Sequence, residues 1–297
     1  MKSDPRTARA SLLSRLAQLR NADGGWPYYR GRQSRLEPTC WAMLATGVPV
    51  DATPLARWTT GSGLLVEPST GQVNYAFNGL AALAIGADPR RPPALVPGVV
   101  AGLVAAKGVA VEASPVIQLD TSLQGWSWIP ETFTWVEPTA WCMLALKRWP
   151  GDPASTSARI EEAERVMRDR VCPGGGWNFG NGIVYGHALP AHVPPTAVGV
   201  LALQDRTKSP VVTDAIRFLE RHALGEGSTT ALALTTLAFA ALGRPTASVI
   251  EALITQCAET DSLGNVAALG MAALALATVA AGDGPQPFRL PAPGVRP

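Results

Sequence analysis

Hydrophobic and polar positions divide the chain into two kinds of segment. In segments such as 158–171, apolar residues recur at helical spacing, with Glu and Arg on the opposite face. Other runs, such as 263–277, are rich in Ala and Leu and apolar on all sides. A helix with one polar face can face solvent, whereas a helix that is apolar all round must be buried. The pattern therefore predicts outer amphipathic helices paired with inner apolar helices.

The inner runs belong to an internal repeat. Each clear copy has a step at or near Gly-Trp, an aromatic loop, a Pro-Thr step and an Ala/Leu-rich run. We place inner-helix starts at Pro38, Pro138 and Pro195, because proline favours the first helical position. Three clear and three weaker copies lie, in chain order, at residues 23–45, 71–86, 124–146, 175–203, 226–243 and 263–277.

Six tandem hairpins predict an all-α fold with almost no strands. We expect a single α6-α6 toroid over residues 1–281, with outer amphipathic and inner Ala/Leu-rich helices. The Pro-rich tail, 282–297, should be extended. It is either a flexible end or a strap across the barrel.

Composition narrows the class of protein. Of 297 residues, 25 are Lys or Arg and 23 are Asp or Glu. The net charge of +2 is too small to attract nucleic acid over the whole surface. The longest weakly polar run, 266–281, is shorter than the ~20 residues of a membrane span, and the N-terminus lacks a signal-type apolar stretch. Four cysteines without a CxxC pair indicate reduced thiols. We expect a cytoplasmic protein without a nucleic-acid partner; peripheral membrane contact is not indicated, and the oligomeric state is open.

The Gly-Trp elements resemble a degenerate form of the QW motif. Residues 135–140, Trp-Val-Glu-Pro-Thr-Ala, are similar to the Asp-x-Asp-Asp-Thr-Ala motif of class II cyclases such as squalene-hopene cyclase. The chain therefore resembles the terpenoid cyclase and protein prenyltransferase superfamily, whose fold is an α6-α6 toroid. The resemblance implies that Glu137 would protonate an alkene or epoxide, although Trp135 and Pro138 replace the flanking acids. It implies no metal or cofactor, because DDxxD and the zinc ligands of prenyltransferases are missing.

Glu37 and Glu137 share one Glu-Pro-Thr context, and both are candidate catalytic residues. A carboxylate in the first turn of a helix also caps free amides and meets the positive end of the helix dipole, which favours its charged form. A proton donor needs the opposite, namely desolvation in an apolar cavity that raises its pKa. Both roles remain open for each residue.

The loops that lead into the inner helices should gather on one rim and supply binding residues. Aromatic rings there could bind an apolar chain or steady a cation, and arginines could bind a diphosphate or carboxylate. His187 could act as a general base, whereas a metal pair with His192 lacks a third ligand. The Trp of each Gly-Trp step is instead expected to be a packing anchor. The binding candidates are Trp128, Phe133, Trp135, Tyr185, Tyr75, Tyr28, Arg30, Arg32, Arg35 and His187.

Three functions fit these observations. The first is a class II-like isoprenoid cyclase or isomerase, which protonates an apolar small-molecule substrate in an aromatic cavity. The second is a toroid without catalysis that binds a lipid, peptide or protein partner. The third is a sugar-active α/α barrel, which requires carboxyl groups about 5–9.5 Å apart. With two of six repeats between Glu37 and Glu137, we expect them nearly across the ring, which counts against the third.

Overall fold

The computed structural model describes residues 4–113, 118–280 and 286–291, and the regular secondary structure in this part of the chain is almost all helix. A two-stranded antiparallel hairpin, β1 (Ile183–Val184) and β2 (His187–Ala188), precedes α7. The α-helices are α1 (Pro5–Gln18), α2 (Leu36–Thr46), α3 (Tyr75–Ala87), α4 (Leu95–Ala105), α5 (Val136–Arg148), α6 (Pro153–Asp169), α7 (Val193–Ala202), α8 (Pro210–His222), α9 (Thr229–Ala241), α10 (Ala247–Thr260) and α11 (Val266–Ala280).

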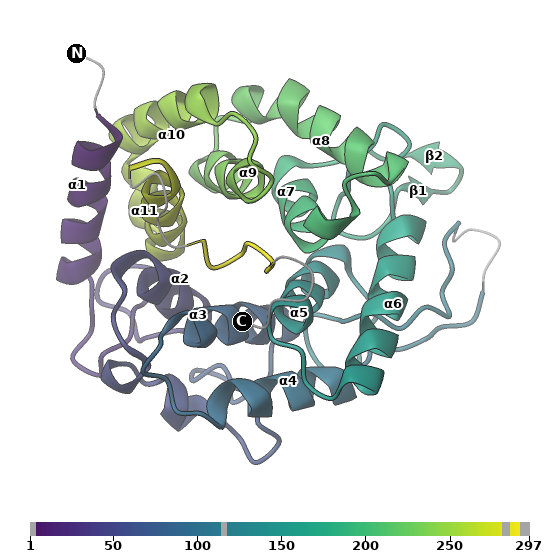
Figure 1. The fold of residues 1–297 in the computed structure, drawn as a ribbon, viewed down its shortest axis with the longest axis horizontal. Coiled ribbons are helices and arrows are strands. Elements are labelled where there is room, and N and C mark those ends of the chain that lie inside the picture. The colour runs from purple at the N-terminus through teal and green to yellow at the C-terminus, as the bar shows by residue number, and fades with distance from the viewer. Residues whose placement is uncertain (1–3, 114–117, 281–285, 292–297) are drawn as a thin grey trace.

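Six of these helices form a closed inner ring. In ring order they are α2, α3, α5, α7, α9 and α11; each packs against the next, and α11 packs back against α2. Helices α1, α4, α6, α8 and α10 lie outside them (Figure 1). The predicted toroid of inner and outer helices is therefore confirmed, with five outer α-helices around the six inner ones in the described residues.

The expected outer helix before α3 is not formed. Its place in the chain holds two 3₁₀ helices, η1 (Val50–Ala52) and η2 (Leu55–Trp58), followed by extended segments. Pro49 and Pro54 each precede one of these short helices, and proline interrupts longer helical hydrogen bonding. Gly63, at φ +83°, contacts the backbone of Gly98 in α4 so closely that a Cβ would lie 2.3 Å from its carbonyl oxygen.

The Gly-Trp steps tie each outer helix to its inner partner. The three indoles are buried, and each donates its N–H to a carbonyl in the last turn of the outer helix before it. The Trp backbone N–H donates to the hydroxyl of the Pro-Thr threonine, at 2.9–3.0 Å in every copy. The predicted role of packing anchor is thus confirmed. The indole bonds are Trp26 to Leu16 (2.7 Å), Trp126 to Leu103 (3.0 Å) and Trp177 to Met167 (2.7 Å).

The same loops also join neighbouring repeats. Two residues after each Trp, a backbone carbonyl accepts a hydrogen bond from the first N–H of an adjacent inner helix. That N–H has no acceptor within its own helix. The bond from Val266 N–H to the Tyr28 carbonyl, 2.9 Å, joins the last inner helix to the first loop and closes the ring. The other two run from Tyr75 to Trp128 and from Val136 to Phe179.

The inner helices begin earlier than proline placement predicts. Helices α2, α5 and α7 start at Leu36, Val136 and Val193, so the prolines stand at the third helical position rather than the first. Proline is tolerated there because the first N–H groups of a helix have no intrahelical acceptor. In consequence, Glu37 and Glu137 are each the second residue of an inner helix.

The described part of the tail, residues 286–291, crosses the interior of the ring (Figure 1). The side-chain amide of Gln204 donates to the Phe288 carbonyl at 2.8 Å, and its oxygen accepts from the Leu290 N–H at 3.0 Å. Phe288 is only 2% exposed. Of the two alternatives for the tail, these residues therefore form a strap; 282–285 and 292–297 lie outside the described residues.

Within the described ranges, no helix has the length and apolar character needed to cross a bilayer. Cys40, Cys142 and Cys172 are buried free thiols and Cys257 is a partly buried one.

Candidate active site

A cavity of about 210 Å³ lies within the ring, and all six inner helices contribute to it. The second residue of every inner helix lines it, which shows that the six helices begin at the same end of the cavity. The positive ends of six helix dipoles therefore meet around this rim. The rim residues are Glu37, Ala76, Glu137, Pro194, Thr230 and Ala267.

Four residues further along the helices, a second layer of side chains lines the cavity. Side chains at this spacing lie one above the other on a helix face. This layer is largely apolar, and its two indoles stand below the two carboxyl groups: Trp41 below Glu37 and Trp141 below Glu137. The layer consists of Trp41, Leu80, Trp141, Leu234 and Met271.

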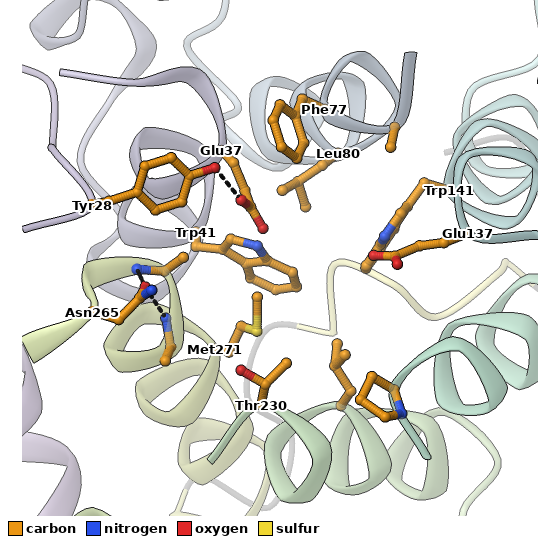
Figure 2. Close-up of a pocket in the computed structure, with 15 residues that line it drawn as sticks. Tyr28, Glu37, Trp41, Phe77, Leu80, Glu137, Trp141, Thr230, Asn265 and Met271 are labelled. Carbon is orange, nitrogen blue, oxygen red and sulfur yellow. Dashed lines mark hydrogen bonds between the residues drawn. The ribbon is translucent and has the colours of Figure 1, made fainter. Parts of the chain in front are cut away.

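The two glutamates face the same cavity. Figure 2 shows their carboxyl groups pointing inward, with the indole nitrogen of Trp41 on the side of Glu37 and that of Trp141 on the side of Glu137. The expectation that they lie nearly across the ring is wrong, because α3 alone separates α2 from α5. The place of a residue around the ring depends on its inner helix. Between the inner helices of Glu37 and Glu137 lies one inner helix, which the weaker copy at 71–86 supplies.

Glu37 belongs to a network of polar side chains. The Tyr28 hydroxyl donates to Glu37 Oε2. Burial raises the pKa of Glu37 above its ordinary value and the negative charge of Glu67 adds to this, while the Tyr28 hydroxyl and the Trp41 indole N–H offset only part of the rise. Arg35 is paired with buried Glu67 (Nε to Oε1, 2.5 Å), and its guanidinium lies 5.7 Å from the centre of the Tyr28 ring. The ionised form of Glu37 therefore has two donors close to it.

Glu137 has fewer partners. Burial raises its pKa to about 7, the negative charge of Glu37 contributes to the same shift, and the Trp141 indole N–H lowers it. The residue equivalent to Tyr28 is Trp128, whose ring packs edge-to-face on Phe77 at 6.4 Å. Glu137 thus lacks a phenol donor, and with a pKa of about 7 a substantial fraction of it keeps its proton at neutral pH. This fits the proton-donor requirement rather than simple helix capping.

Sequence reasoning missed Trp41 and Trp141. Both were visible in the pattern Glu-Pro-Thr-x-Trp, which places an indole one turn after each glutamate. The Trp41 Nε1 is buried without a hydrogen-bond partner, although its indole lies near enough to Glu37 to affect that carboxyl.

Most predicted binding residues lie away from the cavity, and Tyr28 is the one that lines it. The Phe133 ring lies under the Arg170 guanidinium, 5.5 Å from it. Trp135 packs against Gly180, where a Cβ would approach its ring to 2.7 Å. Tyr75 is buried as the first residue of α3, and its carbonyl accepts from the Cys142 thiol.

The remaining candidates are on the surface or in the polar network. Tyr185 is 72% exposed at the turn between β1 and β2. His187, Arg30 and Arg32 are also exposed, and Arg35 is engaged with Glu67. They do not line the cavity. Among the described residues, no cluster of three or more His, Cys, Asp or Glu side chains forms a possible metal site.

The chain matches no family model, and no curated protein matches it. It is similar in structure to Rex8A from Paenibacillus barcinonensis, which was solved in complex with xylose. The TM-score is 0.55 at 11% sequence identity, and the match covers 97% of this chain and 94% of that chain. At this identity the likeness shows a shared fold.

Proposed function

We propose that the protein is a sugar-processing hydrolase in which Glu137 is the general acid and Glu37 the general base. The observation that carries the proposal is that two carboxyl groups from equivalent repeat positions line one small cavity. Glycoside hydrolysis uses such a pair: one carboxylic acid protonates the leaving oxygen, and one carboxylate acts at the anomeric carbon or on a water. An alkene-protonating cyclase needs only the acid.

The environments of the two groups assign the roles. Two ionised carboxylates in a desolvated site repel each other, and the charge of Glu37 helps to raise the pKa of Glu137 to about 7. Tyr28 and Trp41 stabilise the anion on Glu37, whereas Glu137 has the Trp141 indole alone. The negative charge therefore belongs on Glu37 and the proton on Glu137. Glu137 gives its proton to the glycosidic oxygen, and Glu37 takes one from the water that attacks the anomeric carbon.

The size of the cavity favours a single ring as the occupant. Its 210 Å³ is below the roughly 300–1,000 Å³ of pockets that hold drug-sized ligands. A long prenyl chain would need more room, whereas one sugar unit is compact. The lining also suits a polyol, because Thr230 and the two glutamates offer polar groups beside apolar walls. The likeness to Rex8A, solved with xylose, makes xylose-containing compounds the first substrates to test.

The test is hydrolysis of a panel of pentose and hexose oligosaccharides and aryl glycosides. We compare the native protein with Glu137→Gln, Glu37→Gln and the control Glu131→Gln, which changes an exposed glutamate in the loop before α5. Each cavity variant should lose about 10²–10⁴-fold in rate, and the control should keep the native rate. Absence of hydrolysis across the panel, or hydrolysis that survives both cavity variants, would contradict the proposal.

A second candidate is the class II-like isoprenoid cyclase or isomerase. It is favoured by one observation: Glu137, whose pKa is raised to about 7, lines the same cavity as Trp141 and Phe77, whose rings could steady a cation. Incubation with farnesyl and geranylgeranyl diphosphates should then give cyclic products that depend on Glu137 and persist in Glu37→Gln.

A ligand retained unaltered in native mass spectrometry, with no turnover of either substrate class, would instead indicate the binding toroid.

A further inference from the structure

The tail brings an aromatic side chain into the ring from outside the six repeats. Phe288 packs edge-to-face on Trp41 at 5.6 Å and on Trp141 at 5.5 Å between ring centres. The two indoles are themselves 5.7 Å apart, also edge-to-face. The three rings therefore form one mutually packed cluster, a favourable geometry for aromatic side chains.

This cluster lies at the end of the cavity away from the carboxyl groups. Trp41 and Trp141 line the cavity one helical turn below Glu37 and Glu137. Phe288 touches both indoles but is not itself a lining residue, so it lies behind them. Gln204, just after the end of α7, holds the strap in place through two hydrogen bonds. The wall formed by the indoles is thus supported by a residue that no inner helix supplies.

We propose that Phe288 sets the depth of the cavity below the carboxyl pair, and with it the size of the unit that the enzyme removes. The inference rests on the proposed hydrolase function, because it takes the cleaved bond to lie between Glu37 and Glu137. On cleavage, water supplies a hydroxyl to the anomeric carbon, and Glu137 supplies the proton to the departing oxygen. The sugar that is released must fit between the carboxyl groups and the two indoles. The cavity volume of about 210 Å³ accepts one sugar ring there.

Removal of the Phe288 ring should extend the cavity. Loss of a buried aromatic side chain leaves a space that the surroundings refill only partly, and an apolar space of this kind takes up xenon or benzene. The indoles of Trp41 and Trp141 would then border a deeper site that accepts a second sugar unit.

The experiment compares Phe288→Ala with the conservative variant Phe288→Leu. The matched control is Phe239→Ala, which removes another buried ring, from α9, that does not line the cavity and makes no ring–ring contact with Trp41 or Trp141 in the described residues. The native protein and Phe239→Ala should release single units from an oligosaccharide. In Phe288→Ala the ratio of two-unit to one-unit products should rise about tenfold, and Phe288→Leu should restore most of the native ratio.

A second measurement is independent of the substrate. Crystals of Phe288→Ala under xenon pressure should show xenon at the position of the lost ring, against Trp41 and Trp141, which native crystals should lack. If no protein hydrolyses any oligosaccharide, the proposed function fails, and the xenon result alone decides whether Phe288 bounds the cavity. An unchanged cavity in Phe288→Ala, or a deeper cavity with unchanged product length, would overturn the inference.

Discussion

Glu37 and Glu137 occupy the same position in two repeats, yet their surroundings differ. Their helices start almost identically, with Glu-Pro-Thr-Cys-Trp-Ala-Met-Leu in one and Glu-Pro-Thr-Ala-Trp-Cys-Met-Leu in the other. Both glutamates are second helical residues, both stand above an indole, and both line the cavity. Backbone position and helix dipole are therefore alike for the two groups and do not separate their chemistry.

The difference comes from the loops. The first repeat has Tyr28 and Arg35 where the second has Trp128 and Trp135. Tyr28 donates to Glu37, whereas Trp128 turns to Phe77 and leaves Glu137 without that donor. Two carboxyl groups whose surroundings favour different protonation states are suited to acid and base roles. The repeat thus supplies two equivalent positions, and the loops make them chemically distinct.

The largest expected effect separates the two roles by the leaving group. With an oligosaccharide, Glu137→Gln and Glu37→Gln should each lose about 10²–10⁴-fold in rate. With a dinitrophenyl glycoside, whose leaving group needs no proton, Glu137→Gln should recover most of the activity and Glu37→Gln should not. Steady-state rates on the two substrates measure this, and recovery in Glu37→Gln instead would reverse the assignment.

A smaller effect concerns stability. The pKa of Glu137 rises from its ordinary 4.5 to about 7 on folding, so between these pH values the folded protein holds a proton that the unfolded chain has lost. The free energy of unfolding therefore falls as pH rises through this window, by on the order of 3 kcal/mol. Glu137→Gln should be more stable than the native protein at pH 8 by that order and equally stable at pH 4. Urea denaturation at both pH values checks this, and an equal difference at both would count against a buried acid.

The third prediction concerns the donor to Glu37. Tyr28→Phe removes a hydrogen bond to the ionised carboxylate, worth about 1.5–3 kcal/mol, so the pKa of Glu37 should rise further. The acid limb of the pH–rate profile should move up by about one to two pH units, because Glu37 must be ionised to act as base. Tyr29→Phe, which alters the neighbouring half-exposed tyrosine, is the control. An acid limb that moves equally in both variants would exclude a specific role for Tyr28.

The smallest expected effect comes from making the second loop resemble the first. Trp128→Tyr places a phenol at the position equivalent to Tyr28, where it can donate to Glu137 and lower its pKa. The alkaline limb of the pH–rate profile should move down by about half to one pH unit. Trp128→Phe removes the same bulk without adding a hydroxyl, so its profile should stay native. Equal profiles for the two variants would show that the loops place their side chains differently.

The sequence by itself determined the repeats and the local structure of the glutamates. Apolar runs identified the inner helices, the Gly-Trp and Pro-Thr steps marked where outer and inner helices join, and the shared Glu-Pro-Thr context put both glutamates in a first turn. These features follow from neighbouring residues, because helical periodicity and first-turn preferences act over a few positions.

The tertiary structure alone decided what those glutamates meet. It placed only α3 between α2 and α5, gathered six second residues around one cavity, and brought Phe288 against Trp41 and Trp141. It also kept most of the predicted rim aromatics and arginines away from the cavity, because other contacts hold them: Phe133 lies against Arg170, Trp135 against Gly180, and Arg35 is paired with Glu67. Desolvation and charge–charge repulsion depend on distances between groups far apart in the chain, which no local pattern encodes. For this reason the raised pKa of Glu137, on which the proposed chemistry depends, follows from the closed ring and not from the Glu-Pro-Thr motif.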